Sequence, residues 1–446
     1  MSDRPVSASN AESLFQLYRD KSPEKPGTDS KRKTVDLNGR DRYGFKISAS
    51  FVDQEKYNKW WDQYSRYLIR RKLKWVKLMS KNGFEADEDS MPTKFPTRSE
   101  ELKRYVRKGI PAEWRGNAWF YFCKGPERLS KNKGLYDNLC AKMDTLDEVN
   151  LEAIEKDLHR TFPDNIHFND YSGEESLMIG SLRRVLRCYA LYNPEIGYCQ
   201  SLNFIAGQLL IFMDEEKTFW MLVIIHEKLL VDVHTMNLEG VSVHQGVLLL
   251  CFRQYLPLTW SVMREHDTIN DDFLVNIPSL GICTTSWFMS LFIGILPVET
   301  VLRIWDCLFY EDSKSIFRIS LGIFKLMEPQ FVKTPEDELY HLIQSFPRTI
   351  LNPNDLLDVC YRKLNSISHL KQQEIQLCKQ YVINYRAKYK NLKHDDNNLL
   401  SNQERLKLLQ EGIQEFGKPR VLKGLRWNSR LNKQIRKLRV ESEHDI

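Results

Sequence analysis

Two short stretches hold the residues with the clearest chemical potential. Arg160 lies in the stretch from Ile154 to Asn165, and Gln200 ends the stretch Gly197-Tyr198-Cys199-Gln200. An arginine can bind an anion through its planar, charged fork, and a glutamine side chain both donates and accepts hydrogen bonds. Taken alone, an arginine near a helix end more simply complements the helix macrodipole and pairs with Asp157 one turn away. The local pattern therefore leaves both interpretations open.

The first stretch has the signals of a helix that would support Arg160. We expect Asn150 to be the N-cap, with Glu152 adding negative charge in the first turn. Pro163 disfavours the right-handed helical conformation at the residue before it, so we expect the helix to end there. Arg160 would then lie in the last turn, on a rigid support, with its guanidinium free to project.

Two further helices are predicted around the second stretch. Apolar residues at helical spacing indicate a helix from Leu177 to Tyr192, terminated by Asn193-Pro194. The next helix is predicted from Tyr198 to Met213, with Gln200, Asn203 and Gly207 on the side opposite its apolar residues.

Composition places the chain among ordinary soluble proteins. Of its 446 residues, 42% are hydrophobic and 28% charged, which is enough for a sizeable core. The apolar runs 204–213 and 287–296 are shorter than the roughly 20 residues of a membrane helix, so we expect no membrane span. No N-terminal signal is visible, and the nine cysteines are dispersed without a C-x-x-C pair. We therefore expect reduced thiols and a cytoplasmic protein.

Positive charge is concentrated near the C-terminus. The net charge is only +6, and the rest of the chain is close to neutral, which argues against nucleic acid as a partner. Apolar residues at roughly helical spacing within this tail suggest an amphipathic helix on an anionic membrane, although a solvated or intramolecularly docked helix fits equally well. The basic residues of the tail are Arg420, Lys423, Arg426, Arg430, Lys433, Arg436, Lys437 and Arg439.

The pattern along the chain predicts an all-α protein, since no stretch shows sustained alternation or a hairpin signal. Residues 1–40 read as a disordered segment, and 41–101 as an amphipathic aromatic helix and linker. The main domain is predicted at 102–330, with C-terminal helices packed on it at 331–392 and a linker and basic helical tail at 393–446. The aromatic stripe of the first helix could bind a partner or dock onto the main domain.

Other catalytic patterns are absent or incomplete. The stretch 412–418 matches a phosphate-binding loop, but Pro419 stands where a Mg²⁺-binding hydroxyl is needed and a helical pattern precedes it. No H-E-x-x-H motif occurs, and the ten histidines are scattered. Adjacent carboxylates such as Glu174-Glu175 lack any sign of the opposed environments that acid–base chemistry requires.

Five sequence blocks, in a fixed order over about 200 residues, resemble the TBC domain, the GTPase-activating module for Rab GTPases. The blocks are Gly109-Ile110-Pro111 with Trp114-Arg115-Gly116 and Trp119; Ile154-x-x-Asp157-x-x-Arg160 with Thr161-Phe162-Pro163; Gly197-Tyr198-Cys199-Gln200; Trp287-Phe288 with Leu291-Phe292; and Leu302-Arg303-Ile304-Trp305-Asp306.

The resemblance implies two helical subdomains around a groove, with helical extensions at both ends. It also implies that Arg160 serves as an arginine finger and Gln200 as a glutamine finger that orients water, both acting in trans on a GTP-bound Rab. Asp157 would orient Arg160 or a neighbouring basic residue, Arg115 would brace the same region, and Tyr198 would contact the Rab or simply pack. No cofactor of the chain's own is expected, because GTP and Mg²⁺ belong to the partner.

The resemblance extends beyond the core blocks. Asp41-Arg42-Tyr43-Gly44-Phe45 and the Trp60-Trp61 helix are similar to fungal members that serve late secretory and exocytic Rabs, which implies recruitment to membranes or sites of polarised secretion. Two alternatives remain: a non-catalytic Rab-binding scaffold, and a membrane-surface adaptor that uses the basic tail.

Overall fold

The computed structural model describes residues 39–47, 51–87, 89–168, 175–235, 237–265, 273–275, 279–362 and 366–395. The disordered segment predicted over 1–40 and the basic tail predicted over 393–446 therefore lie almost entirely outside the described residues.

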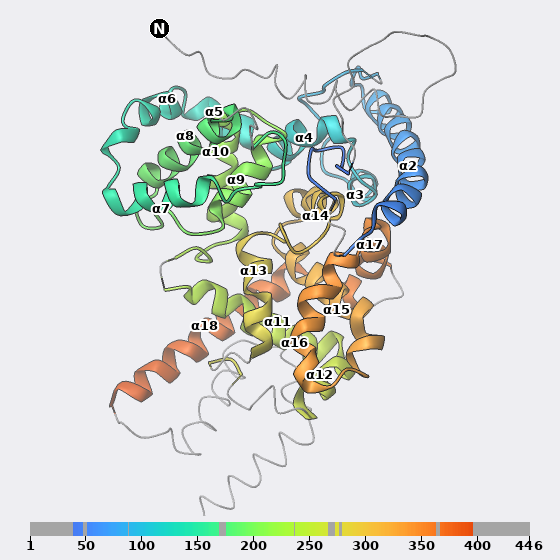
Figure 1. Ribbon diagram of the computed structural model, residues 1–446, viewed down its shortest axis with the longest axis vertical. Helices are drawn as coiled ribbons and strands as arrows, with labels where there is room; N and C mark the ends of the chain where they lie inside the picture. The colour runs from blue at the N-terminus through green and yellow to red at the C-terminus, as the bar shows by residue number, and fades with distance from the viewer. Residues whose placement is uncertain are drawn as a thin grey trace, which may run out of the picture. The chain divides into compact units, whose positions relative to one another are not determined.

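The described residues form helices, joined by turns, in two compact units (Figure 1). The first unit comprises residues 1–236, 289–312 and 348–353, and the second comprises 237–288, 313–347 and 354–446. Within the described residues no strand forms, and the only sheet-like pairs are two isolated bridges, Arg40 with Lys46 and Phe45 with Asn165. The prediction of an all-α protein is confirmed.

The α-helices of the first unit are α2 (Gln54–Lys81), α3 (Glu100–Arg107), α4 (Arg115–Phe122), α5 (Gly125–Lys131), α6 (Leu135–Cys140), α7 (Glu148–Leu158), α8 (Leu177–Tyr192), α9 (Leu202–Leu210), α10 (Glu215–Ile224) and α14 (Val298–Glu311). Short 3₁₀ turns η1 (Ala112–Trp114) and η2 (Met143–Thr145) precede α4 and α7, and a π-helical turn η3 (Ile225–Leu229) extends α10.

The second unit contains α11 (Glu239–Tyr255), α12 (Pro257–Glu265), α13 (Ser279–Met289), α15 (Lys314–Phe331), α16 (Glu336–Ser345), α17 (Pro353–Tyr361) and α18 (Gln372–Asp395). The 3₁₀ turns are η4 (Phe346–Thr349) and η5 (Ser366–His369). Inside this unit α11 packs against α12, α15 and α18. None of the described helices is long and apolar enough to cross a membrane.

Helix α8 is the centre of the part of the first unit that carries both sequence stretches. It packs against α6, α7, α9 and α10, which lie side by side with it in Figure 1. Its bounds agree with the prediction from Leu177 to Tyr192, because the side chain of Ser176 caps its N-terminus by accepting the Ile179 N–H at 3.2 Å. The α7, α8 and α9 packing brings residues near 160 and 200 into one region.

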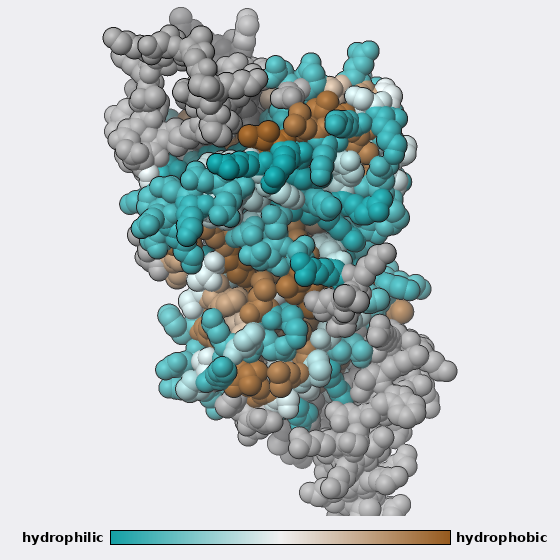
Figure 2. All heavy atoms as spheres, turned by 90° about the vertical axis from the view of Figure 1, so that its right-hand side faces the viewer, coloured by the Kyte–Doolittle hydropathy of each residue, from teal (hydrophilic) through white to brown (hydrophobic). Residues whose placement is uncertain are grey.

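Part of the aromatic stripe of helix α2 docks onto the rest of the first unit, which is one of the two uses considered for it. Tyr64 and Trp75 are buried, and the Trp75 indole N–H donates to Gly109 O at 2.7 Å, so this part of the helix docks inside the first unit. Figure 2 faces the side on which α2 lies, and hydrophilic side chains predominate there, with hydrophobic atoms between them. Trp60 and Trp61, at the N-terminal end, are only half-buried.

Candidate functional site

Arg160 lies in a turn that follows α7. The helix begins at Glu148 with Asp147 as its N-cap, and it ends at Leu158. Arg160 N–H donates to Asp157 O at 3.2 Å and Thr161 N–H donates to Leu158 O at 3.0 Å, so the turn satisfies the last helical carbonyls. The prediction that Asn150 caps the helix is wrong, since the carboxylate of Asp147 accepts the backbone N–H of Asn150.

The predicted helix end also needs correction. Pro163 was expected to hold Arg160 in the last turn, but the chain leaves the helix two residues before Arg160. Phe162, the residue before the proline, has a φ of 51°, in the left-handed region. The Thr161 hydroxyl donates to Asp157 O at 2.8 Å and competes with continued helical bonding. Arg160 is therefore fixed by a hydrogen-bonded turn and not by the helix itself.

The guanidinium of Arg160 is presented to solvent beside a fixed carboxylate. The Arg160 side chain is 62% exposed, and its Nη1 lies 3.7 Å from Oδ1 of Asp157. The other oxygen of Asp157 accepts the Tyr198 hydroxyl at 2.8 Å. Burial, the hydrogen bond to Asp157 and the charge of Asp157 all raise the pKa of Tyr198, so this hydroxyl remains a donor. Asp157 can thus guide the arginine without neutralising it through a close ion pair.

Gln200 lies in an irregular turn ahead of α9. The predicted helix start at Tyr198 is wrong, because α9 begins at Leu202 and Ser201 has a φ of 88°. Gly197, with a φ of 58°, opens the turn, and a Cβ there would lie 2.7 Å from Oδ1 of Asn150. That oxygen accepts the Tyr198 N–H at 2.6 Å. Gln200 is exposed, on a backbone anchored at its start by Asn150.

The first turns of α9 close the other side of the site. The Asn203 amide donates to the Thr161 hydroxyl at 2.8 Å and to Asp157 O at 3.5 Å. Gly207 allows close approach, since a Cβ there would lie 3.0 Å from both the Phe162 ring and the Thr161 methyl group. The two sequence stretches are therefore joined by side chains of α7 and α9 and of the two turns.

Sequence reasoning missed two of these links. Asn150 was expected to serve its own helix, and Asn203 was placed only on a polar stripe, whereas the structure uses both to hold the turns together. The one available signal was the polarity of Asn203 on a mainly apolar helix.

The surrounding charges leave Arg160 as an exposed cation in an otherwise balanced region. On α8, Arg183 and Arg187 both donate to Glu155, and Arg183 also pairs with Glu175. Burial tends to raise the pKa of Glu155, but the hydrogen bonds from the two arginines outweigh it and the pKa is lowered. The basic face of α8 is thus compensated by nearby carboxylates.

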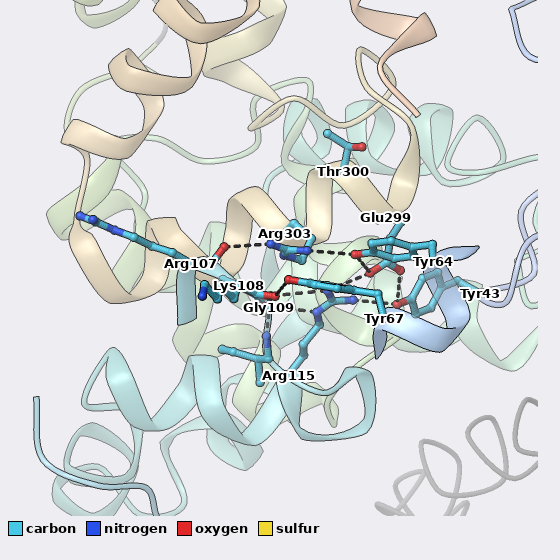
Figure 3. Close-up of polar contacts among 12 residues, drawn as sticks. Tyr43, Tyr64, Tyr67, Arg107, Lys108, Gly109, Arg115, Glu299, Thr300 and Arg303 are labelled. Carbon is cyan, nitrogen blue, oxygen red and sulfur yellow. Dashed lines mark hydrogen bonds and ion pairs between the residues drawn. The ribbon is translucent and has the colours of Figure 1, made fainter. Parts of the chain in front are cut away.

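Arg115 occupies the interior of the first unit. It donates to the Tyr43 hydroxyl at 2.7 Å and to Glu299 at 3.0 Å, as Figure 3 shows, and its Nε lies 3.3 Å from Asp306. The side chain is fully buried. Trp119 also donates to Asp306, at 2.9 Å.

The hydrogen bonds around Arg115 are connected to the Arg160 turn through residues 41–46. The side chain of Asn165 donates to Tyr43 O at 3.0 Å, and Ile166 N–H donates to Gly44 O at 3.2 Å. Arg115 bonds to the Tyr43 hydroxyl, and Tyr43 belongs to the segment that pairs with residues 165–166. Arg115 therefore helps to hold that segment in place. Its side chain bonds to Tyr43 and to α14, and among the described residues it makes no hydrogen bond to Arg160 or Asp157.

The described residues contain no group of three or more His, Cys, Asp or Glu side chains that could hold a metal ion. The exposed guanidinium of Arg160 can stabilise negative charge, and the exposed amide of Gln200 can orient a polar group by hydrogen bonds.

Comparison with known proteins places this region inside a recognised family domain. Residues 112–332 match the Rab-GTPase-TBC domain. The chain is 40% identical over 479 residues to "GTPase-activating protein GYP3" of Saccharomyces cerevisiae, covering 90% of this chain and 75% of that protein. It is 43% identical over 396 residues to "GTPase-activating protein MSB4" of the same yeast, covering 77% and 80%.

A solved structure shares the fold. The crystal structure of the Chlamydomonas flagellar RabGAP TBC domain matches with a TM-score of 0.58 and 24% identity, over 73% of this chain and 99% of that one. At this level of identity the likeness supports the fold alone.

Proposed function

Because this chain belongs to the Rab-GTPase-TBC domain family, we propose that it accelerates GTP hydrolysis by a Rab-family GTPase, with Arg160 and Gln200 acting in trans. The observation that carries the proposal is that an exposed guanidinium and an exposed amide project from two turns tied together by Asn150, Asp157, Tyr198 and Asn203. The family resemblance noted in the sequence is confirmed by these comparisons.

Arg160 would stabilise the negative charge that develops on the phosphates during hydrolysis. A guanidinium supplied in trans contributes on the order of 10³ to 10⁵ in rate. The loose contact with Asp157, 3.7 Å at Nη1, leaves the other donors of the fork for phosphate oxygens. Since an ammonium cannot reproduce this fork, Arg160→Lys should be severely impaired.

Gln200 would position the attacking water, because its amide offers both a donor and an acceptor. Its location ahead of α9 supports this role, since the anchored turn limits where the exposed side chain can reach. GTP and Mg²⁺ would be carried by the Rab, and this chain would contribute no cofactor.

A single-turnover GTP hydrolysis assay over a panel of Rabs tests the proposal. Wild type, Arg160→Ala and Gln200→Ala are compared with Lys156→Ala, an exposed cation on α7 that serves as the matched control. We expect the first two variants to lose about 10³-fold or more of the acceleration, and the control to keep it. Tight binding of Rab-GTP without acceleration by wild type would instead indicate a scaffold.

We further propose that the substrate is a Rab of vesicle transport in late secretion, and that the protein works at membranes. The support is the resemblance of residues 41–45 and of the Trp60-Trp61 helix to fungal members of that kind, together with the basic tail. Including exocytic Rabs in the panel tests the first point. Flotation with anionic vesicles tests the second, by comparing the full chain with one in which Arg430, Lys433 and Arg436 are replaced by Gln; equal binding would exclude a role for these residues.

A further inference from the structure

A pocket of about 290 Å³ lies in the first unit, and neither Arg160 nor Gln200 is among the residues that line it. Its walls come from residues 41–47, the N-terminal end of α2, the Arg160 turn, α9, the segment leading into α14, and residues 348–351. The walls are mainly apolar, with the aromatic rings of Tyr57, Trp60, Trp61 and Phe162 among them. Pockets with apolar walls and a few placed polar groups are typical of ligand sites.

Two buried donors at this pocket have no hydrogen-bond partner among the described residues. Gln208, on α9, is only 2% exposed, and its Nε2 is unpaired. The indole N–H of Trp60, also in the wall, is likewise unpaired. An unpaired buried donor costs free energy comparable to a lost hydrogen bond, so such groups are rarely left in a core without a purpose.

The cations of the pocket wall are also available. Within the described part of the chain, Arg42 makes no direct ion pair with a carboxylate and lies over the rings of Tyr43 and Trp61, at 5.2 and 5.6 Å, although its charge helps to lower the pKa of Glu299. Arg348 lies over the Phe51 ring at 4.7 Å, again without a carboxylate among the described residues. A cation over an aromatic face keeps its N–H groups free to donate at the ring edge.

The two carboxylates of the wall are already occupied. Glu299 accepts from Arg115 at 3.0 Å and from the Tyr43 hydroxyl at 2.8 Å, as seen in Figure 3. Asp41 accepts the backbone N–H groups of Tyr43 and Phe45 at 2.8 and 3.0 Å. The pocket therefore offers a ligand apolar walls, donors without a hydrogen-bond partner among the described residues, and two arginines that make no direct ion pair there.

We propose that this pocket binds an amphipathic anion: an apolar chain or ring system with one carboxylate or phosphate, the acidic end bonded by Gln208 and flanked by Arg42 and Arg348. If each carbon group takes about the 30 Å³ that a water molecule occupies, the pocket volume accommodates an apolar chain or ring system of roughly ten carbon atoms. Such a group could arrive as a free acid or as part of an anionic membrane lipid.

Calorimetric titration of the full chain with decanoate tests the proposal. We expect one decanoate per chain, with affinity weakened about tenfold in Gln208→Leu, which loses a charge-assisted hydrogen bond, and in Arg42→Gln, which loses a neighbouring positive charge. Val298→Phe should abolish binding by filling the pocket from the start of α14. The matched control is Arg70→Gln, an exposed arginine of α2 outside the pocket wall, and it should bind as wild type does.

Two further ligands test separately the contributions of the charge and of the apolar part of the ligand. Decanol, which lacks the charge, and inorganic phosphate, which lacks the apolar body, should each bind at least about tenfold more weakly than decanoate. Vesicles of anionic lipid distinguish the source: binding lost in the same three variants identifies a membrane lipid as the ligand, and unchanged vesicle binding identifies the free acid.

Failure of wild type to bind decanoate would overturn the proposal. So would equal binding by wild type and by Arg42→Gln, provided that the variant has the circular dichroism spectrum and melting temperature of wild type. Because Arg42 is only half-buried, we expect its replacement to leave the fold intact, so the test stays decisive even if a variant at Gln208 fails to fold.

Discussion

Replacing Asn150 by Ala should reduce catalysis without touching either proposed finger. The side chain of Asn150 accepts the Tyr198 N–H at 2.6 Å and donates to Asp147 at 2.6 Å. Asn150→Ala removes the acceptor and leaves the N–H of Tyr198 unpaired, which costs about 1–3 kcal/mol. If this cost destabilises the conformation of the turn that positions Gln200, the population of that conformation drops about 5- to 150-fold.

The assay is single-turnover GTP hydrolysis at saturating activator, together with the affinity for Rab-GTP. The rate constant should fall within that range, while the affinity changes by less than about twofold, because misplacement of a catalytic group mainly affects the chemical step. Asn138→Ala, an exposed asparagine of α6, serves as the control and should leave both quantities unchanged.

A swap of the two side chains provides a rescue. In the double variant Asp147→Asn, Asn150→Asp, a carboxylate again accepts the Tyr198 N–H and an amide again donates across the pair, while Asn and Asp cap helices equally well. We expect most of the rate to return. A wild-type rate constant in Asn150→Ala, or a defect confined to Rab affinity, would refute the reasoning that this side chain positions the glutamine turn.

Two other changes test the interior that supports the site. Arg115→Met leaves Glu299 and Asp306 without their buried cation and should lower the free energy of unfolding by about 3–5 kcal/mol; urea denaturation would measure it, and a loss below about 1 kcal/mol would contradict it. Burial lowers the pKa of His226 to about 3 and of His234 to about 4. Both are neutral in the fold, so the stability they contribute is present above pH 6.5 and is lost as the pH falls toward 4. The pH dependence of unfolding should be weaker in His234→Gln, and identical profiles would disprove this origin.

The sequence was informative where local rules decide the structure. Helix α8 was predicted with its observed bounds from its apolar spacing and the Asn193-Pro194 terminator, and the structure adds Ser176 as its cap. The grouping of Arg160 with Gln200 came from the order of several motifs, since nothing local distinguishes Arg160 from an arginine that complements a helix dipole.

The rest depends on partners that are distant in the sequence. The local sequence predicts that Asn150 caps a helix. Its side chain can accept the Tyr198 N–H only once α7 and the Gly197 turn have come together. Arg115 was expected beside the site, yet its partners Tyr43 and Glu299 lie 72 and 184 residues away along the chain. The left-handed φ of Ser201, which displaces the start of α9, follows no residue preference, because serine does not favour that region.

The central claim is that Arg160, presented by its turn, acts on the nucleotide of a bound Rab. The most direct measurement is the single-turnover rate of GTP hydrolysis by the most responsive Rab with wild type, Arg160→Ala and Lys156→Ala at equal occupancy of the complex. We expect Arg160→Ala to bind the Rab but to lose about 10³-fold or more of the acceleration, while Lys156→Ala keeps it. An Arg160→Ala protein that accelerates hydrolysis as wild type does would contradict the account.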